Sequence, residues 1–143
     1  MKFVLDASVA LRWFLAEEAH PHADAVLERL LEAPELFAVP ELFYFEVHAV
    51  LARTHPAFPG VFTSGLLPAT QAGPLRYPMT AQVADRAAGY VARGLGGNDA
   101  VYAAVAKELG AVWLTFDAAA HERLRGEGIS CDLAKELPDL SGS

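Results

Sequence analysis

The sequence predicts an α/β domain, a three-layer sandwich in which helices flank a mainly parallel central sheet. Short apolar segments rich in strand-forming residues alternate with helical segments of about 10 to 15 residues. This alternation continues along nearly the whole chain, and parallel strands need such crossover helices between them. In addition, 53% of the 143 residues are apolar, enough to build one buried core.

The first half of the chain is predicted to hold two strands, each followed by helix. The first apolar run ends at Asp6 and leads into a helix. Proline marks the helix starts at Pro21 and Pro40, where its missing N–H costs nothing. The expected elements are a strand at 2–5, a helix beginning at 7–11, a helix at 21–33, a strand at 36–39 and a helix from 40 to about 53.

The second half begins with an irregular segment, residues 54–80, which holds five of the nine prolines. Thr80 and Asn98 are expected to cap helices, and Gly110 to end one. The expected elements are a broken helical piece at 61–67, a short strand at 75–77, helices at 81–93 and 99–109, a strand at 112–116, a helix at 118–125 and a strand at 129–133.

Length and composition predict a single domain, residues 1–137, followed by a polar tail at 138–143; 143 residues fall within the usual ~100 to 200 for one domain. The only cysteine, Cys131, cannot form an internal disulfide, which favours a reducing compartment. Asp6 and Arg12 interrupt the apolar start before it is long enough for an export signal. Prolines interrupt the longest run of uncharged residues, so this run is not expected to form a membrane-spanning helix. We therefore expect a cytoplasmic protein with no membrane segment.

The net charge argues against the usual mode of nucleic-acid binding. Eleven Lys and Arg against 18 Asp and Glu give a formal charge of -7. Proteins that bind nucleic acid through its phosphates usually carry a basic patch. Any function on nucleic acid must therefore depend on a local site.

Four acidic residues are predicted to meet at one edge of the sheet. Asp6 and Asp117 each follow an apolar strand, and ligands of parallel sheets bind beyond the carboxyl ends of the strands. Asp99 stands at a helix start, which lies at the same edge because crossover helices run antiparallel to the strands. Glu46 lies in an apolar helix, where an unpaired carboxylate is costly. Acids without an interleaved base favour a hard divalent cation with oxygen ligands.

Each acid also has a structural explanation. The three aspartates could cap or stabilise the starts of the helices beside them. Glu46 could pair with Arg12 or Arg53, and Arg12 could alternatively contact a nucleic-acid phosphate. Neither explanation accounts for the convergence of four acids, so we favour a metal site.

The remaining chemistry-bearing side chains are assigned to surface or core. His20 and His22 lack the spacing of a zinc motif and are expected at the surface. His121, one turn after Asp117, could reach the cleft, but a surface position is favoured for it too. Phe45 and Trp113 stand in apolar runs and are expected in the core.

The order and separation of several motifs resemble PIN domains, and within them the VapC-like toxins of bacterial toxin–antitoxin pairs. The matching stretches are VLDASVAL at 4–11, PELFYFEV at 40–47, NDAVYAAVA at 98–106 and LTFD at 114–117. Each piece alone is weakly specific, but together they span nearly the whole chain. The departure is the proline-rich segment 54–80, where similar proteins have more regular helix.

The resemblance implies a PIN-like nuclease domain that hydrolyses RNA phosphodiester bonds with Mg²⁺ or Mn²⁺. It also implies a homodimer and a small antitoxin protein as partner. The implied catalytic and metal-binding residues are Asp6, Glu46, Asp99 and Asp117, with Ser8 and Thr115 as supporting hydroxyls.

Two other functions stay open. One is Mg²⁺-dependent phosphoryl transfer through an aspartyl nucleophile. Phosphatases of the haloacid-dehalogenase type need a second Asp two positions after the nucleophile, where Ser8 stands, and receiver domains need a late strand-end Lys that is missing. The other is a non-catalytic scaffold with the same fold, and the intact set of acids argues against it.

Overall fold

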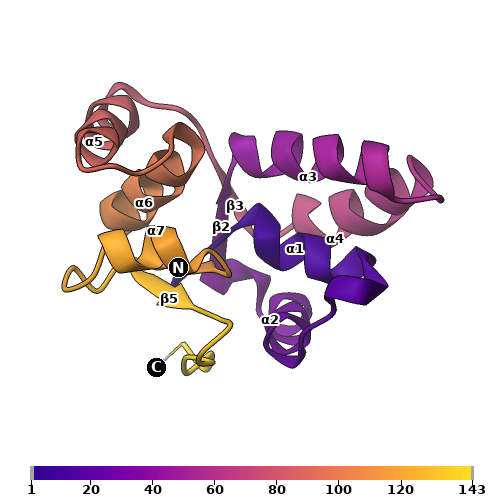
Figure 1. Cartoon of the computed structure of the whole chain (residues 1–143). Helices are drawn as coiled ribbons and strands as arrows, with labels where there is room; N and C mark the ends of the chain where they lie inside the picture. Colours follow the sequence, from indigo (N-terminus) through magenta and orange to yellow (C-terminus); the bar gives the residue numbers. More distant parts are fainter. Residues whose placement is uncertain (1, 143) are drawn as a thin grey trace.

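The computed structural model describes residues 2–142 and has three layers, with a parallel sheet between two groups of helices (Figure 1). Every strand pairing is parallel, and the strand order is β3-β2-β1-β4-β5. The predicted fold class is therefore confirmed. The strands are β1 (Phe3–Leu5), β2 (Phe37–Pro40), β3 (Leu75–Tyr77), β4 (Val112–Thr115) and β5 (Ser130–Asp132).

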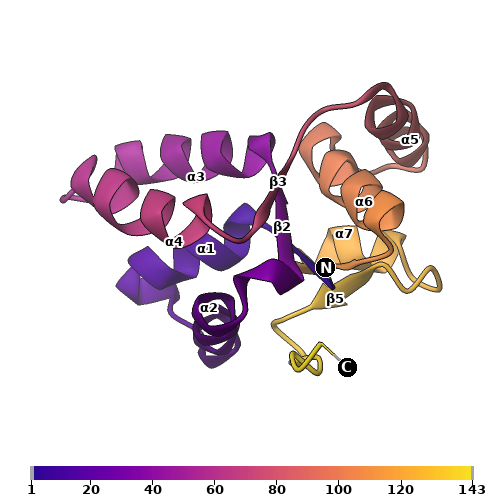
Figure 2. The same ribbon diagram turned by 180° about the vertical axis from the view of Figure 1, so that it is seen from behind.

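The order of the strands explains why the helices form two groups. The chain moves from β1 outward to β3, then returns past β1 to β4 and β5. Because parallel crossovers are right-handed, the two directions place their helices on opposite faces of the sheet. Figure 2 shows the same separation from behind. One group holds α1 (Ala7–Phe14), α2 (Pro21–Glu32), α3 (Glu41–Thr54) and α4 (Leu67–Gln71), and the other holds α5 (Ala81–Ala92), α6 (Gly97–Leu109) and α7 (Ala118–Arg123).

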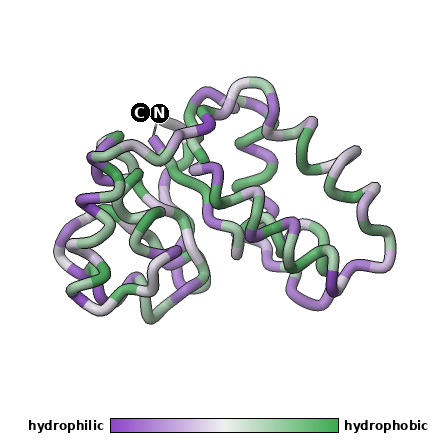
Figure 3. Tube along the Cα trace, turned by 90° about the horizontal axis from the view of Figure 1, so that it is seen from above, coloured by the Kyte–Doolittle hydropathy of each residue, from purple (hydrophilic) through white to green (hydrophobic). Residues whose placement is uncertain are grey.

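The core lies on both faces of the sheet, and β1 and β2 are buried along their whole length. Trp113 of β4 is fully buried and stacks on Tyr102 of α6, with ring centroids 5.7 Å apart. Phe45 differs from the prediction: its side chain is 72% exposed, because the opposite side of α3, with Phe43 and Val47, faces the core. Viewed from above, hydrophobic residues run through both groups of helices (Figure 3).

The start of α6 also differs from the prediction. The N-cap is Gly96 and the helix begins at Gly97, so Asn98 lies inside the first turn and does not cap. The physical reason is that the Asn98 amide donates to Glu46 on α3. The predicted stop at Gly110 is confirmed, since this glycine adopts the left-handed conformation with φ of 63°.

The irregular segment 54–80 folds as a broken helix followed by a short edge strand, as predicted. A π-helical stretch at Val61–Leu66 continues into α4. Fully buried Thr70 donates to the Leu66 carbonyl (2.9 Å), and Tyr44 of α3 donates to the Thr70 carbonyl (3.3 Å). The first bond lies within the segment, and the second fastens it to α3. Short 3-10 turns at Ala16–Glu18 and Pro34–Leu36 complete the connections.

The polar tail packs against α2. Arg29 donates from Nε to the Leu140 carbonyl (2.7 Å) and from Nη2 to the Ser141 carbonyl (2.9 Å). The domain boundary after residue 137 stays a prediction. Among residues 2–142 no helix combines the length and the apolar character needed to span a bilayer.

Candidate acidic site

The candidate site lies where the chain leaves two neighbouring strands toward opposite faces of the sheet. β1 pairs with β4, with Leu5 beside Leu114, and their following helices α1 and α7 belong to different groups. Such a switch point opens a crevice at the carboxyl ends of the strands. Asp6 directly follows β1, and Asp117 follows two residues after the end of β4.

The capping explanation is correct for both of these aspartates. Asp6 is the N-cap of α1 and accepts from the Ser8 amide (3.5 Å), while Asp117 is the N-cap of α7 and accepts from the Ala120 amide (3.0 Å). A cap uses only one carboxylate oxygen for the amide bond. Capping therefore leaves acceptor capacity on both residues.

Asp6 is the most buried acid of the site, with 6% of its surface exposed. Its Oδ2 accepts from the Ser8 hydroxyl (3.1 Å) and from the Thr115 hydroxyl. Burial raises the pKa of Asp6 to about 6 despite the lowering effect of the Thr115 hydrogen bond, and the charge of Glu46 adds to the rise. The environment thus opposes the ionised form of Asp6.

The two hydroxyls also hold the segment that carries Asp117. Thr115 Oγ1 accepts from the Asp117 amide (3.0 Å), and Ser8 Oγ accepts from the Phe116 amide (3.1 Å). Each hydroxyl therefore donates to Asp6 and accepts from the chain after β4. They fix the two strand ends relative to each other.

Glu46 is half-buried on α3 and is held by α6. The side-chain amide of Asn98 donates from Nδ2 to Oε2 of Glu46 (3.1 Å), and the Tyr102 hydroxyl donates to Oε1 (2.7 Å). No ion pair in residues 2–142 includes Glu46, so the alternative of an Arg12 or Arg53 partner is wrong. Burial and the charges of Asp6 and Glu46 raise the pKa of Tyr102 well above its usual value, which keeps its hydroxyl a donor.

Asp99, in the first turn of α6, interacts electrostatically with each of the other three acids of the site. Burial, the charges of Asp117, Asp6 and Glu46, and a hydrogen bond shared with Asp117 together raise its pKa to about 7, with burial the largest cause. The structure therefore brings the four predicted acids within electrostatic reach of one another. Their roles as metal ligands and catalytic groups stay predictions.

The donor chemistry of the cluster fits a hard divalent cation. Its acids are oxygen donors, and none of them takes part in an ion pair within residues 2–142. In that part of the chain, no three His, Cys, Asp or Glu side chains already enclose an ion-sized position. The raised pKa values of Asp6 and Asp99 reflect burial and mutual repulsion, and a cation would relieve that repulsion.

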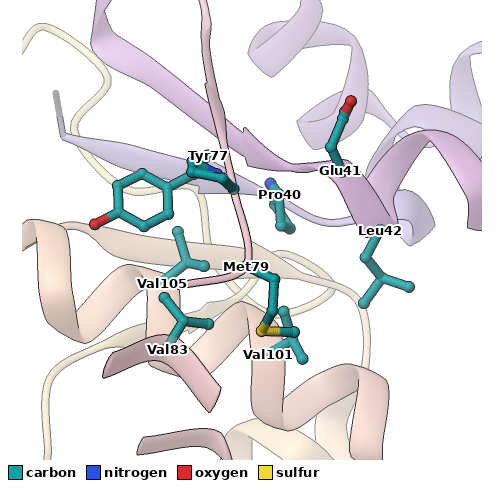
Figure 4. Close-up of a pocket in the computed structure, with 9 residues that line it drawn as sticks. Pro40, Glu41, Leu42, Tyr77, Met79, Val83, Val101 and Val105 are labelled. Carbon is teal, nitrogen blue, oxygen red and sulfur yellow. The ribbon is translucent and has the colours of Figure 1, made fainter. Parts of the chain in front are cut away.

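A separate pocket between β3 and the α5–α6 pair is too small to be a nucleotide site. Figure 4 shows Val83, Val101, Val105 and Met79 around it, below Tyr77. Its volume is about 50 Å³, enough only for small groups such as water, and its lining is mainly apolar.

Sequence reasoning missed Asn98 and Tyr102 as supports of Glu46. Asn98 has the residue type of a helix cap, and Tyr102 has the character of a core aromatic. A signal was present: both stand one turn apart on the helix that carries Asp99, and a carboxylate on apolar α3 needs donors. His121 contacts Ser130 Oγ (2.7 Å), and within residues 2–142 its side chain forms no hydrogen bond with the four acids.

The comparison with known families agrees with this arrangement. Residues 3–126 match the PIN domain family, most of the chain. The chain belongs to the PIN domain family. No curated protein matches this PIN domain.

Solved structures with the same fold include proteins from three organisms. A toxin–antitoxin complex from Klebsiella pneumoniae has a TM-score of 0.67 at 16% identity, covering 92% of this chain and 98% of that one. PAE2754 from Pyrobaculum aerophilum has a TM-score of 0.68 at 21% identity, covering 100% and 97%. FitAcB from Neisseria gonorrhoeae has a TM-score of 0.73 at 16% identity, covering 94% and 99%. At these identities the likeness establishes the PIN fold.

Proposed function

We propose that this PIN domain is a metal-dependent endoribonuclease and the toxin of a VapBC-type toxin–antitoxin pair. The observation that carries the proposal is the convergence of four carboxylates, without a paired base, at the switch point between β1 and β4. Hydrolysis of a phosphodiester needs a way to hold a negatively charged group next to these acids. A divalent cation supplies it.

The proposed ligands of one or two Mg²⁺ or Mn²⁺ ions are Asp6, Glu46, Asp99 and Asp117. A bound ion would supply charge stabilisation at the phosphate and a water of lowered pKa. Ser8 and Thr115 hold Asp6 in place, while Asn98 and Tyr102 orient Glu46.

Asp99 can exchange a proton near neutral pH, because its pKa lies at about 7. In the absence of a cation it is protonated for much of the time at neutral pH. Ionisation of Asp99 therefore accompanies the binding of a cation.

An aspartyl phosphotransferase is supported less well. Its nucleophile would be Asp6 at the end of β1, but that side chain is only 6% exposed and its Oδ2 already accepts from two hydroxyls. A nucleophilic carboxylate oxygen must reach the phosphorus. Trapping with beryllofluoride checks the point, and an adduct on Asp6 would favour phosphotransfer.

We infer an antitoxin partner from the structural neighbours, one of which is a toxin–antitoxin complex and another FitAB bound to a DNA fragment. The partner is expected to place an arginine in the acidic site, where negative charge is concentrated. A homodimer is supported by the exposed Phe45, which lines a hollow of about 320 Å³ with Phe62 and Leu67; Glu41, His48 and Arg76 line the same hollow. Reduced, buried Cys131 is consistent with the proposed cytoplasmic location.

The proposed function is tested by incubating purified protein with a panel of tRNAs and single-stranded RNAs in Mg²⁺, in Mn²⁺ and in excess EDTA. We expect cleavage of at least one RNA with either ion and none in EDTA. Cleavage that persists in EDTA would contradict the metal mechanism. The absence of cleavage and of binding across the whole panel would contradict the ribonuclease assignment.

A further inference from the structure

Arg12 lies one helix turn beyond Ser8 on the side of α1 that faces the end of β4. Ser8 and Arg12 are four residues apart, so they share one face of the helix, about 6 Å apart along its axis. Ser8 donates to Asp6 and accepts from the Phe116 amide. The guanidinium of Arg12 lies over the Phe116 ring, 4.0 Å from its centroid. Arg12 therefore stands at the rim of the acidic site.

The guanidinium is held in position but its charge is not neutralised. Nη1 donates to the Glu18 carbonyl (3.0 Å), and the Phe116 ring supports the plane of the group. Nε is buried and has no hydrogen-bond partner. Within residues 2–142 Arg12 forms no ion pair, in a chain that has 18 acidic residues. The remaining N–H groups of Nη1 and Nη2 are therefore left for an anionic ligand.

Phe116 couples this cation to the reaction site. It directly precedes Asp117, and its amide is fixed by Ser8. His20 packs on the Phe116 ring (5.1 Å between centroids) and is itself in contact with His22 (4.9 Å). Both histidines are half-buried, His20 against the Phe116 ring and His22 against His20, which differs from the exposed surface predicted for them. The aromatic group keeps Arg12 at a fixed place beside the acids.

We propose that Arg12 is a phosphate-binding residue for the RNA strand and positions a phosphate next to the one cleaved at the acidic cluster. The inference rests on the proposed function. A protein with a net charge of -7 has no overall attraction for RNA phosphates. A guanidinium held at the rim of the site provides a local positive contact for one phosphate. Arg12 acts on the strand beside the reacting phosphate, so it is a positioning residue.

The test measures RNA binding as a function of salt. The probe is a fluorescein-labelled 15-nucleotide single-stranded RNA of mixed sequence, with unfractionated tRNA as a second ligand. Full-length protein carrying Asp99→Asn, with Mg²⁺ present, serves as the cleavage-defective parent. Arg12→Ala in this parent is expected to reduce the slope of log K against log salt by about 0.7, the loss of one phosphate contact on a single strand. Arg12→Lys is expected to restore the slope, because it restores one positive charge.

The matched control is Arg86→Ala on α5, which removes the same charge from an exposed position in the other helix group. Its slope is expected to equal that of the parent. An unchanged slope in Arg12→Ala, or an equal fall in Arg86→Ala, would overturn the inference while leaving the proposed function intact. If wild-type protein in Mg²⁺ binds and cleaves neither RNA, the proposed function is overturned and this inference with it. Equal thermal midpoints for the variants would show that the slope reports binding and not folding.

Discussion

Tyr102 donates a hydrogen bond to Glu46 over 2.7 Å, although the two residues lie 56 positions apart in the chain. Asn98, one turn earlier on the same helix, donates to the other carboxylate oxygen over 3.1 Å. Asp99 lies between these two donors in the sequence of α6. One helix therefore carries an acid of the site and orients a second acid that belongs to α3.

Replacing Tyr102 by Phe is expected to reduce cleavage by roughly 10- to 100-fold, the usual cost of losing a group that orients a metal ligand. The fold should persist, because Phe keeps the stacking on Trp113 at 5.7 Å. Cleavage rates at saturating and limiting Mn²⁺ provide the measurement. The loss should be larger at limiting Mn²⁺, since the variant weakens a ligand.

The matched control for this change is Tyr77→Phe. Tyr77 donates to Glu108 over 2.5 Å beside the apolar pocket of Figure 4, and neither residue contacts the four acids through any hydrogen bond within residues 2–142. Its cleavage rate should match that of wild type. Equal losses in both variants would show that the hydroxyl of Tyr102 has no special part in the site.

Replacing Thr115 by Val is expected to move the acid limb of the pH–rate profile to higher pH. The Thr115 hydrogen bond lowers the pKa of Asp6, which burial has raised to about 6, so its loss lets that pKa rise further. More alkaline conditions are then needed to ionise Asp6. Thr70→Val is the control. Thr70 is as buried as Thr115, but its hydroxyl donates to the Leu66 carbonyl and not to an acid of the site. A profile that does not move in Thr115→Val would contradict the role of this hydroxyl.

The fold could be predicted from the sequence because local signals and topology agreed. The end of β1 just before Asp6, the end of β4 two residues before Asp117 and the stop at Gly110 follow from residue type and apolar periodicity. The side of α3 that faces the core could not be predicted, since apolar residues lie on nearly all its sides. Hydrophobic periodicity does not distinguish one face of α3 from another. Packing against neighbouring helices decides which face is buried, and Phe45 lies on the exposed face.

The candidate site could be predicted as a set of acids but not as a hydrogen-bonded arrangement. Parallel-sheet topology brings the acids to one edge, which needs no knowledge of side-chain positions. The donors Asn98 and Tyr102 depend on how α6 packs against α3, a contact between distant segments. The partner of Arg12 also depends on contacts between distant segments. The sequence suggested Glu46 as that partner, whereas in the structure the Arg12 guanidinium lies over the Phe116 ring.

The stability of the metal-free protein is expected to depend on pH through Asp6 and Asp99. Their folded pKa values, about 6 and about 7, lie above the ordinary value of 3.8. Between pH 3.8 and about 7 the folded state binds more protons than the unfolded state. The contribution of these two groups to the free energy of unfolding therefore falls as pH rises from about 4 to 7. It stays at its lower value above pH 7. Urea unfolding midpoints in EDTA across this range provide the measurement.

Asp99→Asn removes the contribution of Asp99 to that effect. At pH 4 wild-type Asp99 is protonated when folded, so Asn should be a near-equal substitute. Above pH 7 the variant should be more stable than wild type, because it lacks a charge that Asp117, Asp6 and Glu46 repel. Asp85→Asn, which removes a carboxylate from an exposed position on α5, should show no such pH-dependent gain. A gain that is constant with pH would contradict repulsion within the cluster.

The same variant decides whether Asp99 is a metal ligand, because stability and metal binding then change in opposite directions. In wild type, Mn²⁺ at 100 times its Kd should add about 2.7 kcal/mol to the free energy of unfolding by binding only the folded state. Asp99→Asn should lose most of that increment and also abolish cleavage, although the metal-free variant is at least as stable as wild type at neutral pH. A helix-start residue with no metal role would behave otherwise: Asn would replace it with little effect, and both the Mn²⁺ increment and cleavage would persist. Thermal melts of wild type, Asp99→Asn and Asp85→Asn, each in EDTA and in Mn²⁺, separate these cases. An Mn²⁺ increment in Asp99→Asn equal to that of Asp85→Asn would remove Asp99 from the site, while loss of the increment in Asp99→Asn alone would establish that its carboxylate binds the ion.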